Sequence, residues 1–189
     1  MKAIIFYDSL GGNTEKVART IFETTKKQLP ATEIVKVNKN TECNFLDYDL
    51  IFIGSPVVDW LPTQTMIDFV KKNLKKLNEN GKIKPSAPMV PGKFSICFGT
   101  YGGPHIGKNE AEPMTMWFRS ALEHMGFLVL DSWHTVGQFR KMDNMKELNT
   151  KGRLGNIENR PNESDLLNIK NRVEGTLASL VAWHTPAMG

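Results

Sequence analysis

The sequence lacks the features that mark several large classes of protein. It has no apolar run long enough to span a bilayer and no signal-peptide pattern at its start, so we expect no membrane span. Its two cysteines, Cys43 and Cys97, show no C-x-x-C spacing, and Cys97 sits in an apolar run typical of a buried strand. The expectation is therefore a reduced, cytoplasmic protein.

Metal and nucleic-acid sites are not indicated either. The four histidines show neither H-E-x-x-H nor H-x-x-x-H spacing, so no metal site is predicted. The formal net charge is +4, but the densest basic group, 71–76, falls on the polar face of a predicted helix, where lysines are usually solvated. Because no basic strand interleaved with aromatic residues accompanies it, we expect no nucleic-acid partner.

One short stretch near the N-terminus carries most of the functional information. It joins an apolar run, 3–7, to an amphipathic segment, 15–29, and reads Ser9-Leu10-Gly11-Gly12-Asn13-Thr14. A strand–loop–helix turn of this kind directs backbone N–H groups and a helix N-terminus at one point, which suits a phosphate. The loop has neither the lysine of a Walker A motif nor G-x-G-x-x-G spacing. The alternative is a plain N-capped helix, with Asn13 or Thr14 as the cap.

Apolar runs and amphipathic segments alternate along the whole chain. Strands are expected at 3–7, 33–37, 49–54, 94–98 and 127–130, with the last extending as far as Val136. Helices are expected at 15–29, at 63–77, from the cap Asn109 to Gly126, and at 162–182. This alternation predicts one α/β domain over 1–189, with a parallel sheet covered by helices on both faces. The stretch 138–161 is polar and aperiodic, so we expect an excursion or lid-like loop there.

Ligands of such folds sit outside the carboxyl ends of the strands, where three loops are expected to meet. The first is the loop 9–14. The second contains Pro56, Val57, Val58, Asp59, Trp60 and Leu61, and the third contains Thr100, Tyr101, Gly102 and Gly103. A ligand with a phosphate at one end and a flat aromatic system at the other would satisfy all three loops. Taken singly, Trp60 could instead plug the rim of the fold, and Tyr101 could pack on the sheet end.

These loops resemble those of the flavodoxin family, and the resemblance covers the chain except for 138–161. Phosphate loops of that family resemble [S/T]-x-[T/S]-G-N-T, which the stretch 9–14 matches except at Gly11, where a hydroxyl residue is common. The stretches 54–62 and 98–103 look like the family's second and third loops around the isoalloxazine. The resemblance implies a flavodoxin-like doubly wound three-layer sandwich with strand order 2-1-3-4-5. It also implies FMN, bound without a covalent link by the three loops.

No catalytic residue is predicted, because a flavin would carry the chemistry. The implied function is that of an FMN-binding redox protein, which passes electrons to a partner protein or a small-molecule acceptor. It is either an NAD(P)H-dependent oxidoreductase of the quinone or flavin reductase type or a flavodoxin-type electron carrier. A flavin-free regulatory or binding domain on the same fold is a third alternative. The basic charge argues against a typical carrier, since carriers of this family are typically acidic. An oligomer is compatible with each.

The second loop bears on the choice between carrier and reductase. In flavodoxin-like carriers a peptide of this loop turns over when the flavin is reduced, and a glycine makes that turn easy. The stretch 56–61 has no glycine, and Val57 and Val58 are β-branched residues that oppose a positive φ. We expect Asp59 alone to tolerate the left-handed region, and therefore a single fixed turn that favours two-electron chemistry.

Overall fold

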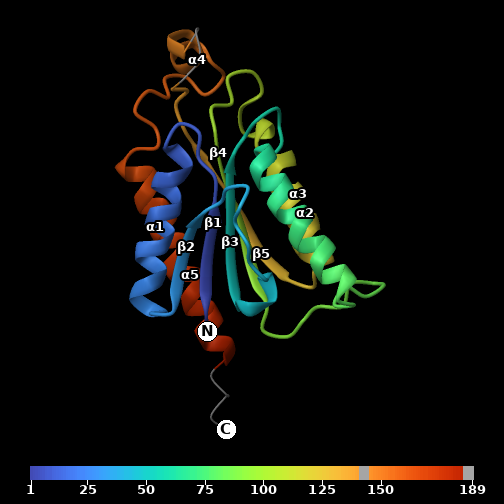
Figure 1. Ribbon diagram of the computed structural model, residues 1–189. Coiled ribbons are helices and arrows are strands. Elements are labelled where there is room, and N and C mark those ends of the chain that lie inside the picture. Colours follow the sequence, from blue (N-terminus) through green and yellow to red (C-terminus); the bar gives the residue numbers. More distant parts are fainter. Residues whose placement is uncertain (141–144, 185–189) are drawn as a thin grey trace.

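The computed structural model describes residues 1–140 and 145–184. Five strands form one parallel sheet in the order β2-β1-β3-β4-β5. Their bounds are β1 Ala3–Tyr7, β2 Thr32–Lys36, β3 Leu50–Pro56, β4 Phe94–Tyr101 and β5 Leu128–Val136. Helices α1 (Asn13–Gln28) and α5 (Glu163–His184) cover one face, and α2 (Gln64–Glu79) and α3 (Glu112–His124) cover the other (Figure 1). The predicted three-layer fold and its strand order are confirmed.

Each face of the sheet packs its own apolar core. Successive strand residues point to opposite faces, so the uniformly apolar strands need helices on both sides. Phe52, Phe98 and Trp133 pack toward α1 and α5, whereas Phe6, Ile53 and Cys97 pack toward α2 and α3. Burial raises the pKa of the Cys97 thiol, as expected for a thiol in a central strand. The two cores hold the carboxyl ends of the strands at one edge of the molecule.

Two predicted boundaries are wrong at the third loop. β4 continues to Tyr101 rather than ending at Phe98, because its last residues pair with the end of β5, where Tyr101 lies opposite Val136. α3 begins at Glu112 instead of Asn109, because the residues before it form a separate 3₁₀ turn, η2 (Gly107–Glu110). The predicted extension of β5 to Val136 is confirmed.

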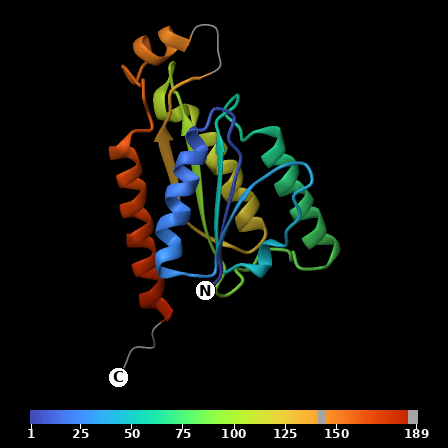
Figure 2. The same ribbon diagram turned by 60° about the vertical axis from the view of Figure 1, so that its left-hand side comes forward.

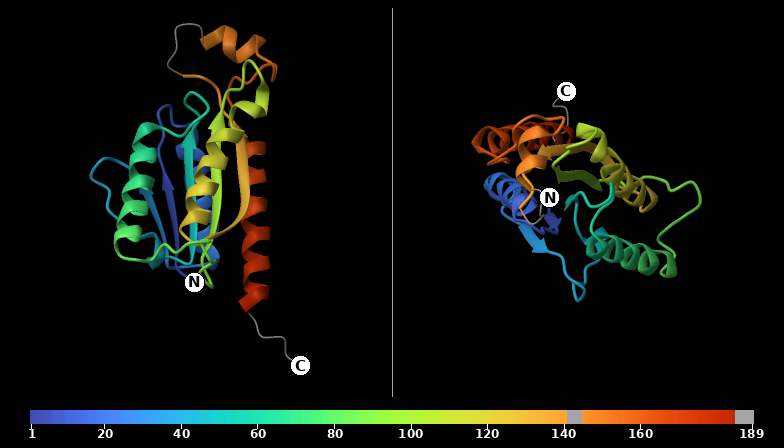
Figure 3. Two further views of the ribbon diagram at one scale, coloured as in Figure 1. Left: turned by 90° about the vertical axis from the view of Figure 1, so that its right-hand side faces the viewer. Right: turned by 90° about the horizontal axis from the view of Figure 1, so that it is seen from above.

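The polar segment 138–161 contains a helix that its sequence pattern did not reveal. α4 (Met145–Lys151) is too short to show a helical period, and it stands above the edge of the sheet where the loops lie (Figures 2 and 3). The buried side chain of Asn149 accepts from the backbone N–H of Phe139 at 2.8 Å and donates to its carbonyl at 3.0 Å. Residues 141–144 of the segment lie outside the described residues.

The tight approach of β3 to β4 gives a first prediction. A Cβ on Gly54 would lie 2.2 Å from the Phe98 ring, so Gly54→Ala is expected to cost about 1–3 kcal/mol of unfolding free energy. Gly175→Ala is the matched control, because its Cβ would meet nothing within 4 Å on α5; it is expected to stabilise by roughly 0.5–1 kcal/mol. Urea unfolding measures both. Equal stability of the two variants would contradict the packing described here.

Candidate functional site

The loop after β1 carries backbone N–H donors that meet no acceptor in the part of the chain that the structure describes. Gly12 is the N-cap of α1 and has a φ of 88°. Within residues 1–140 and 145–184, no group accepts a hydrogen bond from the N–H of Leu10, Gly11, Asn13 or Thr14. The Ser9 hydroxyl accepts from the N–H of Gly12 at 3.1 Å and from that of Glu15 at 3.2 Å. Four free N–H groups at a helix N-terminus are the donor set that a phosphate requires.

The side chains of Asn13 and Thr14 form hydrogen bonds with residues outside the loop. The Asn13 amide donates to the Gln138 carbonyl at 2.8 Å, and the Thr14 hydroxyl shares a hydrogen bond of 2.7 Å with that of Thr100. Neither side chain caps α1, so the alternative of a side-chain cap at Asn13 or Thr14 is wrong. These two side chains tie the loop to other parts of the chain.

The second loop is a two-residue turn of type I′. Val58 and Leu61 exchange backbone hydrogen bonds of 2.9 Å in both directions, and φ is 48° at Asp59 and 66° at Trp60. The expectation that Asp59 alone would be left-handed is therefore wrong, because Trp60 shares that conformation. A bulky residue held there costs on the order of 1–3 kcal/mol. Trp60 is 57% exposed, so burial of the ring within the fold does not explain the turn.

The third loop combines a buried aromatic ring with bare backbone. Tyr101 is only 9% exposed, and its ring meets that of His134 edge-on at 6.5 Å between centroids. Burial raises the pKa of the Tyr101 hydroxyl. A Cβ on Gly102 would lie 2.1 Å from the ring of Phe139, so the loop and the segment 138–161 are in close contact. Tyr101 and Gly103 are thus buried, and Gly102 between them is partly exposed.

Hydrogen bonds join the three loops into one unit. The buried Asp8 carboxylate accepts from the N–H of Ser9 and from the hydroxyl of Thr63, each at 2.7 Å, and thereby links the first loop to the end of the second. The Thr100 carbonyl accepts from the N–H of Val57 at 2.9 Å, which links the second loop to the third. Sequence reasoning missed Asp8 and Thr63. The available signal was a carboxylate directly after a buried strand.

Exposed apolar side chains gather on these loops. Leu10 on the first loop, three residues of the second and Ile106 beside the third are all exposed; those of the second are Val58, Trp60 and Leu61. Several exposed apolar side chains on loops that end at one edge of a sheet favour a binding surface there. The unpaired N–H groups and this apolar rim lie at the same edge of the sheet.

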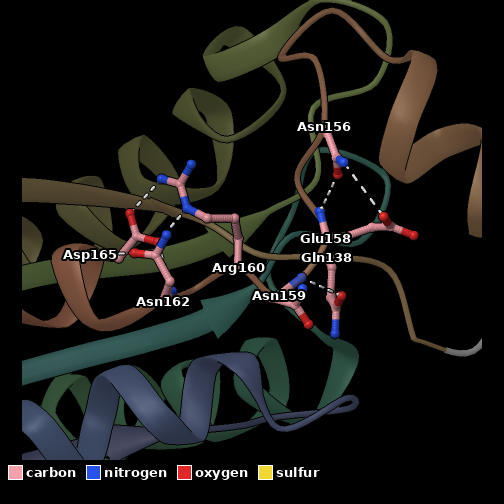
Figure 4. A network of polar contacts seen from close by, with 7 residues as sticks. All are labelled: Gln138, Asn156, Glu158, Asn159, Arg160, Asn162 and Asp165. Atoms are coloured by element: carbon pink, nitrogen blue, oxygen red, sulfur yellow. Dashed lines mark hydrogen bonds and ion pairs between the residues drawn. The ribbon is translucent and has the colours of Figure 1, made fainter.

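The segment 138–161 borders the site and is anchored at both ends. The N–H of Arg153 donates to the carbonyl of Pro104 at 2.8 Å, next to the third loop. At the base of the segment, Gln138 accepts from the N–H of Asn159 at 2.8 Å, and Arg160 forms an ion pair with Asp165 at the start of α5 (Figure 4). The segment is therefore a fixed wall beside the site in the residues described.

A pocket of about 220 Å³ lies apart from the three loops, between the open edge of β5 and α5. Its lining includes two arginines whose charges are paired, Arg160 with Asp165 and Arg172 with Asp131 at 3.7 Å. The described residues contain no cluster of three or more metal-ligating side chains. They also contain no helix of the length and apolarity that crossing a membrane demands.

Comparison with known proteins agrees with this arrangement. Residues 4–83 match the family described as flavodoxin domain. "Flavodoxin-like domain-containing protein BilS" of Clostridioides difficile is 28% identical over 109 residues, which are 57% of this chain and 51% of that protein. The chain thus spans about half the length of that relative.

Solved structures match nearly the whole chain. A flavodoxin of Streptococcus pneumoniae TIGR4 superimposes with a TM-score of 0.63 at 15% identity, covering 95% of this chain and 99% of that one. Flavodoxin 1 of Bacillus cereus superimposes with a TM-score of 0.62 at 16% identity, covering 94% of this chain and 98% of that one. A WrbA-like flavodoxin of Agrobacterium tumefaciens gives 0.63 at 12% identity over 97% and 99%. The resemblance to the flavodoxin family is confirmed, and the fold is flavodoxin-like. Flavodoxins are FMN-binding proteins.

His134, beneath the third loop, gives a second prediction. Burial, with a smaller effect of Lys108, lowers its pKa below 6.5, and its Nε2 lies 2.8 Å from the Thr115 hydroxyl. The unfolded chain therefore takes up this proton at higher pH than the folded protein, so the stability contribution is present above about pH 6.5 and lost below it.

His134→Gln is expected to flatten the fall in unfolding free energy between about pH 7 and pH 5, because it removes this titration. Chemical unfolding at a series of pH values measures the effect. His124→Gln, at an exposed histidine on α3, is the control and should keep the wild-type slope. An unchanged slope in His134→Gln would contradict the assignment.

Proposed function

We propose that the protein binds FMN at the three loops and transfers electrons through it. The observation that carries this proposal is the set of four N–H groups at the start of α1 that have no acceptor in residues 1–140 and 145–184, beside exposed apolar side chains. A phosphate accepts from such donors and is favoured by the helix dipole. Bound flavin supplies the redox chemistry, and the protein supplies the site.

The apolar rim accounts for the other end of the cofactor. Trp60 and Leu61 would cover the ring system, and the backbone of the partly exposed Gly102 would reach its polar edge. The turn at Asp59 and Trp60 holds the indole outside the core, where it is free to stack. The left-handed strain at Trp60 is therefore explained by ligand binding rather than by packing.

Of the two redox roles, we favour an oxidoreductase that uses NAD(P)H over a simple carrier. The described residues of 138–161 are anchored beside the site and narrow the surface on which a partner protein would dock, and the net charge of +4 suits an anionic reductant. Both cysteines are free thiols, which fits the reducing cytoplasm that we propose as the location. We further propose that the chain forms one domain.

The phosphate cradle gives a third prediction, through Gly12→Ala. Gly12 has a φ of 88° with nothing within 4 Å of an added Cβ, so alanine fits in space but strains the loop by roughly 1–2 kcal/mol. We expect FMN affinity to fall about tenfold in this variant. The measurement is a titration of flavin fluorescence with apoprotein.

Gly81→Ala is the matched control, because Gly81 also has a positive φ, 63°, and open space, but lies after α2. It should lose similar stability and keep its FMN affinity. If wild-type apoprotein does not bind FMN, the proposed function is wrong. If Gly12→Ala binds FMN as tightly as Gly81→Ala, the phosphate lies elsewhere.

The turn of the second loop gives a fourth prediction. Turning over the peptide between Asp59 and Trp60 would convert type I′ into type II′. Asp59 would then need a φ near +60° with a ψ near −120°, a region that glycine alone adopts readily. We therefore expect bound flavin to be reduced in a single two-electron wave.

Asp59→Gly is expected to split that wave into two one-electron waves, because glycine permits the turn. Asp59→Asn is the control, since asparagine tolerates the left-handed region but not the type II′ position. Spectroelectrochemistry of the FMN-loaded proteins measures the effect. Two resolved waves in the wild type would contradict the fixed turn and favour the carrier.

A further inference from the structure

Arg140 lies against the phosphate loop, although it follows that loop by more than a hundred residues. A Cβ built on Gly11 would lie 3.5 Å from Cβ, 3.7 Å from Cδ and 3.9 Å from Cγ of Arg140. The aliphatic stem of the arginine thus occupies the space beside the bare backbone of Gly11. Its guanidinium begins one bond beyond Cδ and so lies within reach of the loop.

The position of Arg140 is set by contacts of the two residues that precede it in the sequence. The Gln138 carbonyl accepts from the Asn13 amide at 2.8 Å, and both backbone groups of Phe139 bond to Asn149. These bonds hold the backbone of Gln138 and Phe139 in place, immediately before the arginine. Arg140 therefore meets the first loop because Asn13 binds the segment that carries it.

The charged side chains near the loop are mostly acidic, so a cation there would favour the binding of a phosphate. Asp8 is a buried carboxylate next to Ser9, and Glu15 in the first turn of α1 is paired with Arg19 at 2.7 Å. A phosphate dianion at the loop would lie near the carboxylates of both Asp8 and Glu15, which repel it. The guanidinium of Arg140 is exposed and has no carboxylate or carbonyl partner in the part of the chain that the structure describes.

We propose that Arg140 is a binding residue for the FMN phosphate, with its guanidinium donating to phosphate oxygens above the loop 9–14. The inference rests on the proposed function. It also bears on the glycine at position 11, which lacks a hydroxyl donor: the stem of Arg140 passes that position at van der Waals distance, and its guanidinium offers a stronger, charge-assisted donor in place of the missing one. The segment 138–161 then contributes to cofactor binding.

The test compares FMN with riboflavin, which lacks the phosphate. Arg140→Ala is expected to weaken FMN binding about 10- to 100-fold, as for loss of a charged hydrogen bond, and to leave riboflavin affinity unchanged. Arg140→Lys should restore part of the loss. The matched control is Arg153→Ala, an exposed arginine of the same segment that lies beside Gly107 instead; it should bind both flavins like the wild type.

A pH profile supplies a second readout. FMN affinity of the wild type should rise as the phosphate becomes a dianion near pH 6, and this rise should be smaller in Arg140→Ala. Equal FMN affinity of wild type and Arg140→Ala would overturn this inference and leave the proposed function standing. Equal losses for FMN and riboflavin would also overturn it, since Arg140 would then only hold the loop. Failure of the wild type to bind FMN would overturn both.

Discussion

The candidate site depends on buried hydrogen bonds between the ends of parallel strands. Thr100, at the end of β4, bonds through its hydroxyl to Thr14 on the first loop and through its carbonyl to Val57 on the second. Asp8 and Thr63 make the remaining link. In a site shielded from water such bonds are strong, and leaving one partner unpaired is costly. Loops that are distant in sequence therefore hold one relative arrangement.

In this arrangement the side chains hold the loop in place, and the backbone supplies the hydrogen-bond donors. The side chains of Asn13 and Thr14 bond to neighbouring parts of the fold, whereas the backbone N–H groups of the same residues have no acceptor among the residues described. A donor set held in this way needs no reorganisation when an anion binds, which lowers the cost of binding. The strained turn at Trp60 follows the same principle, since it holds a ring in place before any ligand arrives.

Much of this could be derived from residue pattern. Alternating apolar runs and amphipathic segments predicted the order of elements, because burial on two sheet faces demands helices on both. The stretch 9–14 indicated a phosphate loop because glycines and a helix start are local features. The short helix α4 was not predictable, since seven residues span too few turns to show a period.

What the sequence by itself determined is the fold and the place of the candidate site, because both follow from local periodicity and from the rule that parallel strands end together. Only the tertiary structure decided what each polar side chain does there. Tyr101 turned inward to His134, Asn13 bonded to Gln138, and Arg140 came to lie on Gly11. Each contact joins residues far apart in the chain, and it exists only after the sheet has brought their strands to one edge. A pattern of neighbouring residues carries no information about such pairs.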